Sequence, residues 1–329
     1  MLTNHCYQGD CRAVMRDLIA AGVRVQCIVT SPPYWGLRDY GVAGQLGLEP
    51  TLREFLANMV EVFELCRELL ADDGTLWLNM GDAYAGSWGA QGRPQGKGDM
   101  TGRSVASARQ IGASPRFGTG TGTRGREMGL KSKDLMGQPW RLAFALQDAG
   151  WWLRQDIIWH KPNPMPESVR DRCTKAHEYV FLLTKSERYY FDSPAIAEPA
   201  VEPAGPGNIK PMDPLPGERL GSANANIRGS LHKIGPRELR NRRSVWTVPT
   251  AKYAEAHFAT FPVALVEPCV LAGSRPGDIV LDPFMGSGTV ASVAQRLGRR
   301  WLGAELSPEY ITLQAERTRQ PGLVLEVAA

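Results

Sequence analysis

The sequence predicts an α/β fold built on a mostly parallel sheet, with a separate region inserted into it. Short β-branched apolar runs alternate with longer segments of helical apolar spacing, a rhythm that favours parallel strands covered by helices on both faces. A chain of 329 residues that is 43% hydrophobic can bury a core of the size this fold needs. A glycine-rich turn that follows one strand and opens the next helix marks the sheet edge where such folds bind ligands.

The first elements lie between residues 25 and 80. The run 25–30 (VQCIVT) reads as a buried strand that stops abruptly at Ser31-Pro32-Pro33. Apolar spacing predicts a helix over 52–70, ended by Asp72-Asp73-Gly74, and 75–80 (TLWLNM) is the next expected strand.

Two regions interrupt this pattern. Residues 86–129 are rich in glycine and serine and carry seven Lys or Arg side chains against two acids. Such a segment cannot form a core, so we expect a mobile cationic loop over about 86–130. It is either a plain insertion or, as we favour, a loop that becomes ordered on a phosphate backbone. Residues 195–250 are again dominated by proline, glycine and asparagine, and contain a basic stretch over 228–243.

The remaining segments return to the α/β pattern. We expect helices over 140–146, 262–272, 289–297 and 308–317, and strands over 152–159, 179–184, 279–281 and 301–305. The chain therefore divides into three parts, 1–194, 195–250 and 251–329.

Composition narrows the class of protein. A net charge of +4 permits nucleic-acid binding without arguing for it. The six cysteines are scattered without a CxxC pair, so neither a metal site nor a disulfide framework is expected. Since no apolar run approaches the ~18 residues of a membrane span, we expect a soluble, cytoplasmic protein.

The turn 282–289 (DPFMGSGT) carries the strongest ligand signal. Its glycines allow the backbone to approach a ligand closely because no Cβ intrudes. The next predicted strand ends at Glu305, an acid placed to accept hydrogen bonds from ribose hydroxyls. Together they indicate a nucleoside cofactor, and a dinucleotide is disfavoured because the turn is not GxGxxG.

A second motif, Ser31-Pro32-Pro33-Tyr34, follows the strand over 25–30. The Pro-Pro step stiffens the backbone and removes two donors, leaving carbonyl oxygens that only accept hydrogen bonds. Acceptors beside the flat ring of Tyr34 suit a planar base that bears an amino group. Taken alone, the motif is equally compatible with a proline-rich loop around a buried tyrosine.

Together these motifs resemble those of the DNA amino-methyltransferases. The catalytic signature of that family is Asp, Asn or Ser followed by Pro-Pro-Tyr/Phe, and its cofactor signature is close to the turn 282–289. The catalytic motif comes first and the cofactor motif last, which is similar to the permuted β-type order. The resemblance covers roughly residues 5–85 and 135–320. It implies a Rossmann-like, doubly wound fold that uses S-adenosylmethionine, with 195–250 as an inserted target-recognition region.

The resemblance also implies a reaction. The target nucleotide is rotated out of duplex DNA, Tyr34 stacks on it, and Ser31 Oγ and the Pro32 carbonyl accept hydrogen bonds from its amine. Serine at position 31 is commoner in cytosine-N4 enzymes than in adenine-N6 enzymes, so cytosine N4 is favoured and adenine N6 is the alternative. RNA or protein-glutamine methylation is less expected, and a DNA-binding module without activity least of all.

The same resemblance assigns the cofactor residues. The cradle matches Asp282, Phe284, Gly286, Gly288 and Thr289, with Glu305 at the ribose. Asp10 would lie at the adenine, and Thr260, Phe261 and Pro262 at the methionine end. Asp10 and Thr260 equally suit ordinary helix-capping roles.

Basic residues are the candidates for DNA contact. Lys161 either faces the DNA backbone or is solvated, and the stretch 228–243 either reads bases or phosphates or is a solvated surface. The residues expected to bind DNA are Lys161, Arg237, Arg240, Arg242 and Arg243. Double-stranded DNA is the expected partner, and a cognate restriction endonuclease and a homodimer are compatible with the family. Cys269 follows a proline, as in carbon-5 cytosine enzymes, but lies in an apolar helical run and is expected to be a small buried hydrophobe.

Overall fold

The computed structural model describes residues 3–36, 42–85, 128–200, 239–250 and 261–319. The chain divides into two compact units, one formed by Met1–Phe191 with Ser244–Ala329 and the other by Asp192–Arg243. In the described part of the chain, no helix has the length and apolar character that crossing a membrane requires.

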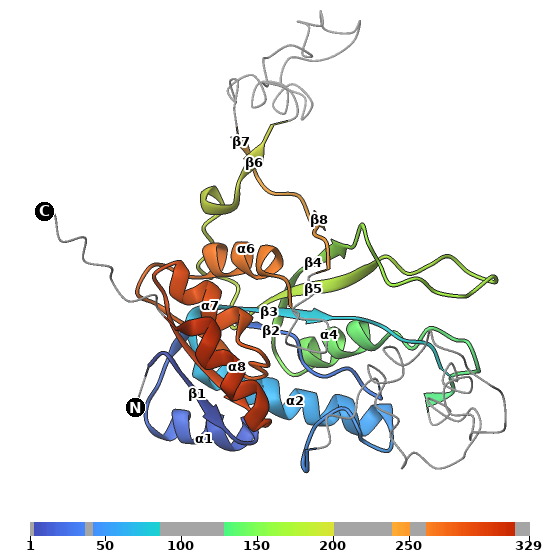
Figure 1. The fold of residues 1–329 in the computed structure, drawn as a ribbon, viewed down its shortest axis with the longest axis horizontal. Coiled ribbons are helices and arrows are strands. Elements are labelled where there is room, and N and C mark those ends of the chain that lie inside the picture. Colours follow the sequence, from blue (N-terminus) through green and yellow to red (C-terminus); the bar gives the residue numbers. More distant parts are fainter. Residues whose placement is uncertain (1–2, 37–41, 86–127, 201–238, 251–260, 320–329) are drawn as a thin grey trace, which may run out of the picture. The chain divides into compact units, whose positions relative to one another are not determined.

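The first unit is built on an eight-stranded sheet in the order β1-β10-β9-β2-β3-β5-β4-β8 (Figure 1). Strand β5 pairs antiparallel with both of its neighbours, and all the other pairings in this sheet are parallel. The predicted mostly parallel sheet is therefore confirmed. Its strands are β1 (His5–Gln8), β2 (Val25–Thr30), β3 (Leu70–Met80), β4 (Trp152–His160), β5 (His177–Thr184), β8 (Val245–Thr247), β9 (Ile279–Asp282) and β10 (Arg300–Glu305).

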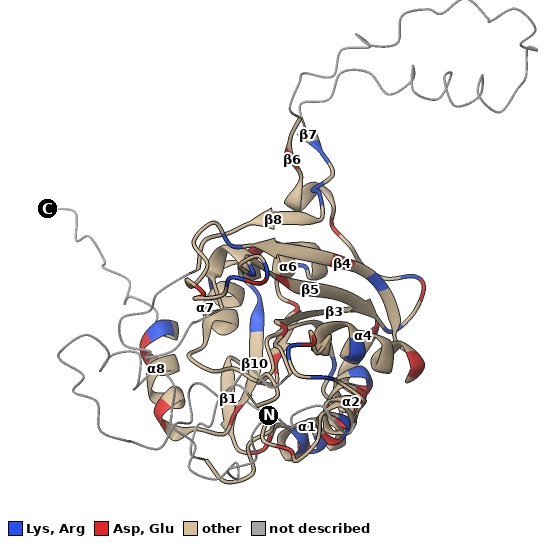
Figure 2. Cartoon of the chain, turned by 90° about the vertical axis from the view of Figure 1, so that its right-hand side faces the viewer, with Lys and Arg blue, Asp and Glu red and all other residues tan. Residues whose placement is uncertain are grey.

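Helices cover both faces of this sheet (Figure 1). Helices α1, α2 and α4 cover one face, α6 and α7 the other, and α8 packs against α7. Lys and Arg are mixed with Asp and Glu on the outer sides of α1, α2 and α4, as expected for solvated helix faces (Figure 2). The helices are α1 (Cys11–Ala20), α2 (Leu52–Leu69), α4 (Gln138–Asp148), α6 (Val263–Gly273), α7 (Thr289–Arg296) and α8 (Pro308–Thr318).

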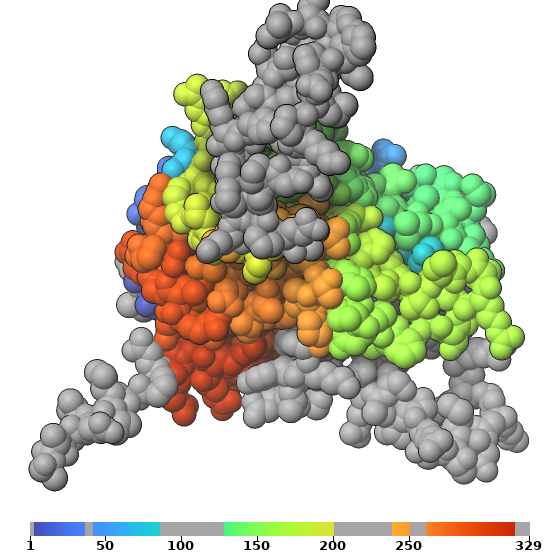
Figure 3. All heavy atoms as spheres, turned by 90° about the horizontal axis from the view of Figure 1, so that it is seen from above, coloured from blue at the N-terminus to red at the C-terminus, as the bar shows by residue number. Residues whose placement is uncertain are grey.

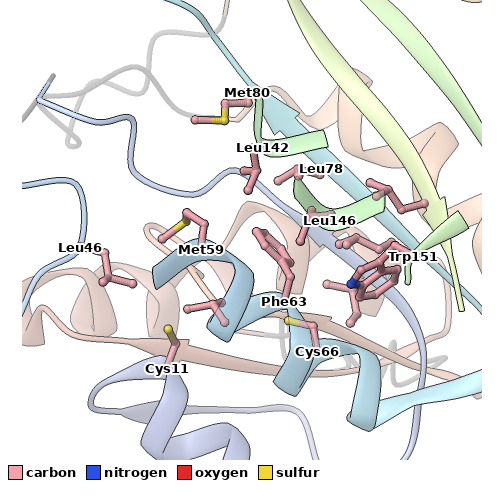
Figure 4. Close-up of a cluster of buried hydrophobic side chains, with 14 of the residues drawn as sticks. Cys11, Leu46, Met59, Phe63, Cys66, Leu78, Met80, Leu142, Leu146 and Trp151 are labelled. Carbon is pink, nitrogen blue, oxygen red and sulfur yellow. The ribbon is translucent and has the colours of Figure 1, made fainter. Parts of the chain in front are cut away.

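The main core lies between α2, α4 and the sheet. Helix α2 begins at Thr51, whose hydroxyl accepts a hydrogen bond from the Glu54 amide at 3.1 Å. Its buried stripe includes Met59 and Phe63, which face α4 (Figure 4), and Cys66, whose Sγ lies 3.5 Å from Met15 Sδ of α1. The helical apolar spacing in the sequence corresponds to this contact.

One predicted boundary is wrong. Asp72-Asp73-Gly74 does not separate helix from strand, because α2 gives way directly to β3 at Leu70. The partner of Val25 in β3 is Leu70 and that of Cys27 is Thr75, so the residues between form a bulge in the strand. Gly74 fits this bulge because a Cβ there would lie 2.9 Å from the Gln26 carbonyl oxygen.

The order of the strands reverses between β9 and β2. The chain runs from β9 outward to β10 on one side and from β2 outward to β3 on the other. Ligands bind at such a switch point, outside the carboxyl ends of the strands. Asp282 ends β9 and Ser31 follows β2, so both predicted motifs begin at this point.

The second unit, Asp192–Arg243, contains a short helix, η3 (Pro194–Ile196), and a two-stranded ladder of β6 (Glu198–Pro199) with β7 (Leu239–Arg240). The predicted inserted region, 195–250, extends further than this unit. Residues 244–250 belong to the first unit because β8 pairs with β4 in the large sheet. Most of the predicted cationic loop, 86–127, and residues 201–238 lie outside the described residues.

We expect Gly273→Ala to destabilise the protein by about 1–3 kcal/mol through overpacking between α6 and the sheet. A Cβ at Gly273 would lie 2.5 Å from Thr75 Oγ1 and 2.7 Å from Cys27 Sγ. Denaturant unfolding measures the change. Ala264→Ser, on the exposed side of the same helix, should change stability by less than about 0.5 kcal/mol. Equal stability of the two variants would contradict the close packing.

Candidate active site

A cavity of about 340 Å³ opens at the carboxyl ends of β9 and β2. Its volume is in the range of small-molecule sites. The structure brings both predicted motifs into its wall. The predicted site residues that line it are Asp10, Ser31, Pro32, Pro33, Tyr34, Lys161, Phe261, Asp282, Phe284, Gly286, Thr289 and Glu305.

The turn after β9 has the backbone shape that only glycine adopts easily. Gly286 and Gly288 have φ angles of 51° and 81°, in the left-handed region. Gly288 caps the start of α7, and its amide donates to the Met285 carbonyl at 2.9 Å. A Cβ at Gly288 would lie 3.0 Å from Gln314 Cγ. Gly288 therefore shapes the turn from behind and is not part of the cavity wall.

Glu305 ties this turn to the end of β10. Its carboxylate accepts hydrogen bonds from the amides of Gly286 and Ser307, each at 2.8 Å. Burial raises the pKa of Glu305 above its ordinary value, which these backbone donors partly oppose. Glu305 is thus held in the cavity wall, while its predicted contact with a ribose stays a prediction.

A buried hydrogen bond joins the two motifs. Thr30, the last residue of β2, donates from Oγ1 to Asp282 Oδ1 at 2.7 Å. The same carboxylate oxygen accepts from the Phe284 amide at 3.0 Å. Burial raises the pKa of Asp282 to about 7, although the hydrogen bond from Thr30 acts to lower this pKa. The ends of β2 and β9 are thereby held side by side.

The Ser31–Tyr34 loop is fixed by two polar side chains from neighbouring strands. Ser31 Oγ donates to Asn79 Oδ1 at 3.1 Å, and the Tyr34 hydroxyl donates to Glu178 Oε2 at 2.9 Å. Asn79 Nδ2 donates to the same oxygen of Glu178 at 3.3 Å. Burial, followed by the charge of Glu178, raises the pKa of Tyr34 well above its ordinary value. The phenol therefore stays protonated and keeps donating.

Sequence reasoning missed Asn79 and Glu178, which both line the cavity. A polar side chain at the carboxyl end of a buried strand was the available signal for Asn79. Glu178 comes near the start of an antiparallel strand, so only the pairing of β5 with β3 brings it to this edge. Gly81 completes the arrangement, because a Cβ there would lie 2.8 Å from Tyr34 Cε2.

Lys161 lies in the cavity wall. Its ammonium group pairs with the Glu178 carboxylate and lies 4.2 Å from the centroid of the Trp159 ring. With 17% of its side chain exposed, Lys161 is neither fully solvated nor an open surface charge. Its contact with DNA stays a prediction.

Other predicted residues have different surroundings. Asp10 caps α1 by accepting from the Arg12 amide at 2.8 Å and pairs with the Arg12 guanidinium, whose hydrogen bond lowers the pKa of Asp10. Pro262 is buried at the start of α6. Cys269 is buried within α6, and its Sγ donates to the Leu265 carbonyl at 3.3 Å. Thr260 lies outside the described residues.

The predicted DNA-binding arginines belong to the second unit. Arg240 Nε and Arg243 Nε both donate to Glu198 Oε1, at 2.9 and 2.8 Å. Arg242 lies between them in sequence, and Arg237 is outside the described residues. The two ion pairs join Glu198 of β6 to Arg240 of β7 and to Arg243, which follows β7. DNA recognition by these arginines stays a prediction.

The family follows from comparison with known proteins. A family model described as DNA methylase, of the N6 and N4 class, matches residues 25–317. The chain belongs to this DNA methylase family. It is 46% identical to the Type II methyltransferase M.XycI of Xanthomonas campestris pv. cyanopsidis, over 98% of this chain and 90% of that protein. It is 45% identical to M.SmaI of Serratia marcescens, over 94% and 88% of the two chains.

The fold has solved relatives. The PvuII DNA methyltransferase matches with a TM-score of 0.59 and 17% identity, over 97% of this chain and 87% of that one. The predicted family, doubly wound fold and cofactor are confirmed: the methylase is an S-adenosylmethionine-dependent methyltransferase of exocyclic DNA amines.

The residues of the cavity fit this cofactor. S-adenosylmethionine supplies a methyl group on a positively charged sulfur. The acidic side chains of Asp10, Asp282 and Glu305 line the wall and suit a cationic nucleoside. Gly286 has no side chain, so a ligand can approach its backbone closely. Volume, charge and backbone shape therefore agree.

We expect Asp282→Asn to stabilise the cofactor-free methylase at pH 8 more than at pH 5. The folded-state pKa of Asp282, about 7, lies above its ordinary value of 3.8. The folded protein then binds this proton more tightly than the unfolded chain, so its stability falls as pH rises through this range. Asparagine keeps the acceptor for Thr30 without the buried charge. Denaturant unfolding of both proteins at both pH values measures this stabilisation. Equal stabilisation at pH 8 and pH 5 would contradict this account.

Proposed function

We propose that this methylase transfers a methyl group to N4 of cytosine within a specific site in duplex DNA. The observation that carries the proposal is the setting of Ser31. Its hydroxyl proton is directed to Asn79, so its oxygen presents lone pairs to the cavity. Serine at this position is typical of cytosine-N4 enzymes in the family, and the PvuII enzyme is itself described as cytosine-N4-specific. Adenine N6 is the alternative, because both amines offer the same two donors.

The catalytic residues act by positioning. The flipped base stacks on Tyr34, whose ring is fixed by Glu178 at its hydroxyl and by the close approach of Gly81. Ser31 Oγ and the Pro32 carbonyl accept hydrogen bonds from the amine. These bonds would reduce the conjugation of the nitrogen lone pair with the ring and direct that lone pair toward the methyl donor. The bond from the methyl group to nitrogen would form as its bond to sulfur breaks, and the amine would release one proton. Catalysis rests on orientation and electrostatics without a covalent bond to the enzyme.

In this proposal the turn after β9 would hold the cofactor. Asp282, Phe284 and Thr289 would bind its methionine part together with Phe261, and Glu305 would accept hydrogen bonds from its ribose. Asp10 would lie at the adenine. Pro262 and Thr260 stay candidates for the methionine end, and Thr260 lies outside the described residues.

The second unit supplies target recognition. Arg240 of its ladder and Arg243, which follows the ladder, share the acid Glu198, so two guanidinium groups lie close together. Lys161, Arg237 and Arg242 add to the DNA contacts. Because the relatives are Type II methyltransferases, a cognate restriction endonuclease is the proposed partner, in a cytoplasmic restriction–modification pair. A homodimer remains a sequence prediction.

The base is identified by incubating the purified methylase with labelled S-adenosylmethionine and duplex DNA, then digesting the DNA to nucleosides. We expect label in N4-methylcytosine. Label in N6-methyladenine alone would transfer the proposal to adenine, and label in neither would refute it. Sequencing of modified bases in DNA from cells that express the protein gives the recognition site.

We expect Ser31→Ala to lower turnover roughly 10- to 100-fold, because one acceptor at the reacting amine is lost. The affinity for S-adenosylmethionine should stay unchanged, since Ser31 is assigned to the base. Single-turnover kinetics and calorimetric titration separate the two effects. Ser132→Ala, an exposed serine, is the control. Loss of cofactor binding in Ser31→Ala would contradict its assigned role.

A further inference from the structure

The loop 161–176, which joins β4 to β5, projects beyond the sheet (Figures 1 and 3). We call it the β4–β5 loop. It begins in the wall of the active site, because Trp159 and Lys161 both line the cavity. Its two ends meet where the Lys161 amide donates to the Ala176 carbonyl at 2.8 Å. The loop is therefore an extension of the catalytic wall toward solvent.

Met165 is the exposed apolar residue of this loop. It is 78% exposed, more than any other large hydrophobic residue in the described part of the chain. It stands between Pro164 and Pro166, with Pro162 two residues before. Prolines fix φ and remove backbone donors, so this arm neither coils into a helix nor pairs into a ladder. A single exposed methionine is ordinary on a surface. An exposed methionine that stands between two prolines beside an active site is unusual.

Contacts at its base hold the arm in place. Asn163 Oδ1 accepts a hydrogen bond from the Thr250 amide at 2.9 Å. Two residues earlier, Lys161 pairs with Glu178 inside the cavity. Met165 itself lines neither the cavity nor the core. Its backbone is anchored while its side chain stays in solvent.

The return arm is braced separately. Arg172 lies over the ring of Tyr84, 3.9 Å from its centroid, and pairs with Glu167 at 2.5 Å. Asp171 pairs with Lys133 at 2.6 Å. Contacts with Thr250, Tyr84 and Lys133 therefore tie both arms of the loop to the rest of the unit. A preordered loop loses less conformational entropy on binding than a flexible one.

The segment that carries Met165 lies beside the cavity, because Asn163, two residues before it, accepts a hydrogen bond from the amide of Thr250, which lines the cavity. Met165 is four positions after Lys161, and such a length of chain spans at most about 14 Å. This limit is similar to the width of the DNA major groove, about 12 Å. Rotation of the base out of the stack leaves a gap and costs stacking energy. Methionine is one of the apolar side chains that enter base steps, and its unbranched thioether fills irregular space.

We propose that Met165 is a DNA wedge: it enters the base stack beside the target nucleotide and fills the space that the flipped base leaves. The proposal rests on DNA methylation by this family and not on which base is methylated. The wedge stabilises the flipped state, so its contribution is large when the target base is paired. It is small when the base has no partner to leave.

The test uses the full-length protein and two duplexes that contain its recognition site, as found by modified-base sequencing. In one the target base is paired, and in the other it faces an abasic site. We expect Met165→Ala to lower kcat/KM about tenfold on the paired duplex and less than about twofold on the other. Met165→Leu, which keeps an apolar side chain of similar volume, should retain most of the activity. Phe144→Ala is the control, because Phe144 is 50% exposed on α4 and should affect neither duplex.

Two outcomes would overturn the proposal. An equal loss on both duplexes would show that Met165 supports the active site or a general DNA contact, and no loss on either would show that it has no part in base flipping. If the methylated base proves to be adenine, the same two duplexes are made with adenine as the target. The wedge test therefore gives its answer even where the cytosine assignment fails.

Discussion

The hydrogen bond between Thr30 and Asp282 is the contact on which the active site depends. It joins side chains 252 positions apart in sequence, at the ends of the two strands that meet at the switch point. A buried carboxylate is unfavourable without donors, and Asp282 Oδ1 receives two, from Thr30 Oγ1 and the Phe284 amide. One carboxylate oxygen consequently links the end of β2, just before the Ser31–Tyr34 loop, to the turn after β9.

The order of the strands explains the rest of the site. Reading across β9, β2, β3 and β5, each strand contributes one polar group to the same edge: Asp282, Thr30, Asn79 and Glu178. Asn79 pairs with Val180 in the β3–β5 register, which places Glu178 just beyond the end of β3. The reversal of β5 matters for this reason, because it brings the beginning of a strand to the edge where its neighbours end.

Local features could be predicted from the sequence, and long-range pairing could not. Strand β2, helix α2 and the turn after β9 carry their signals within a few residues, through β-branched runs, helical spacing and glycine. Glu178 has no such signal, since its role depends on pairing with a strand almost a hundred residues earlier. Asp72-Asp73-Gly74 is typical of a helix end as well as of a bulge, so the sequence predicts a helix end where the strand bulges. Strand β8 is short and the residues before it in sequence are polar, so the sequence predicts its residues in the inserted region and not at the sheet edge.

Glu178 also links the two surfaces that a DNA substrate would meet. Its carboxylate receives Tyr34 and Asn79 from the base-binding side, and Lys161 from the start of the β4–β5 loop. Three donors, one of them the Lys161 cation, compensate the charge of this partly buried acid, and removal of any one would weaken that compensation. The same three contacts tie the Tyr34 side chain and the start of the β4–β5 loop to the Glu178 carboxylate. The position proposed for a flipped base and the start of the loop that carries Met165 are therefore set by the same group of the sheet.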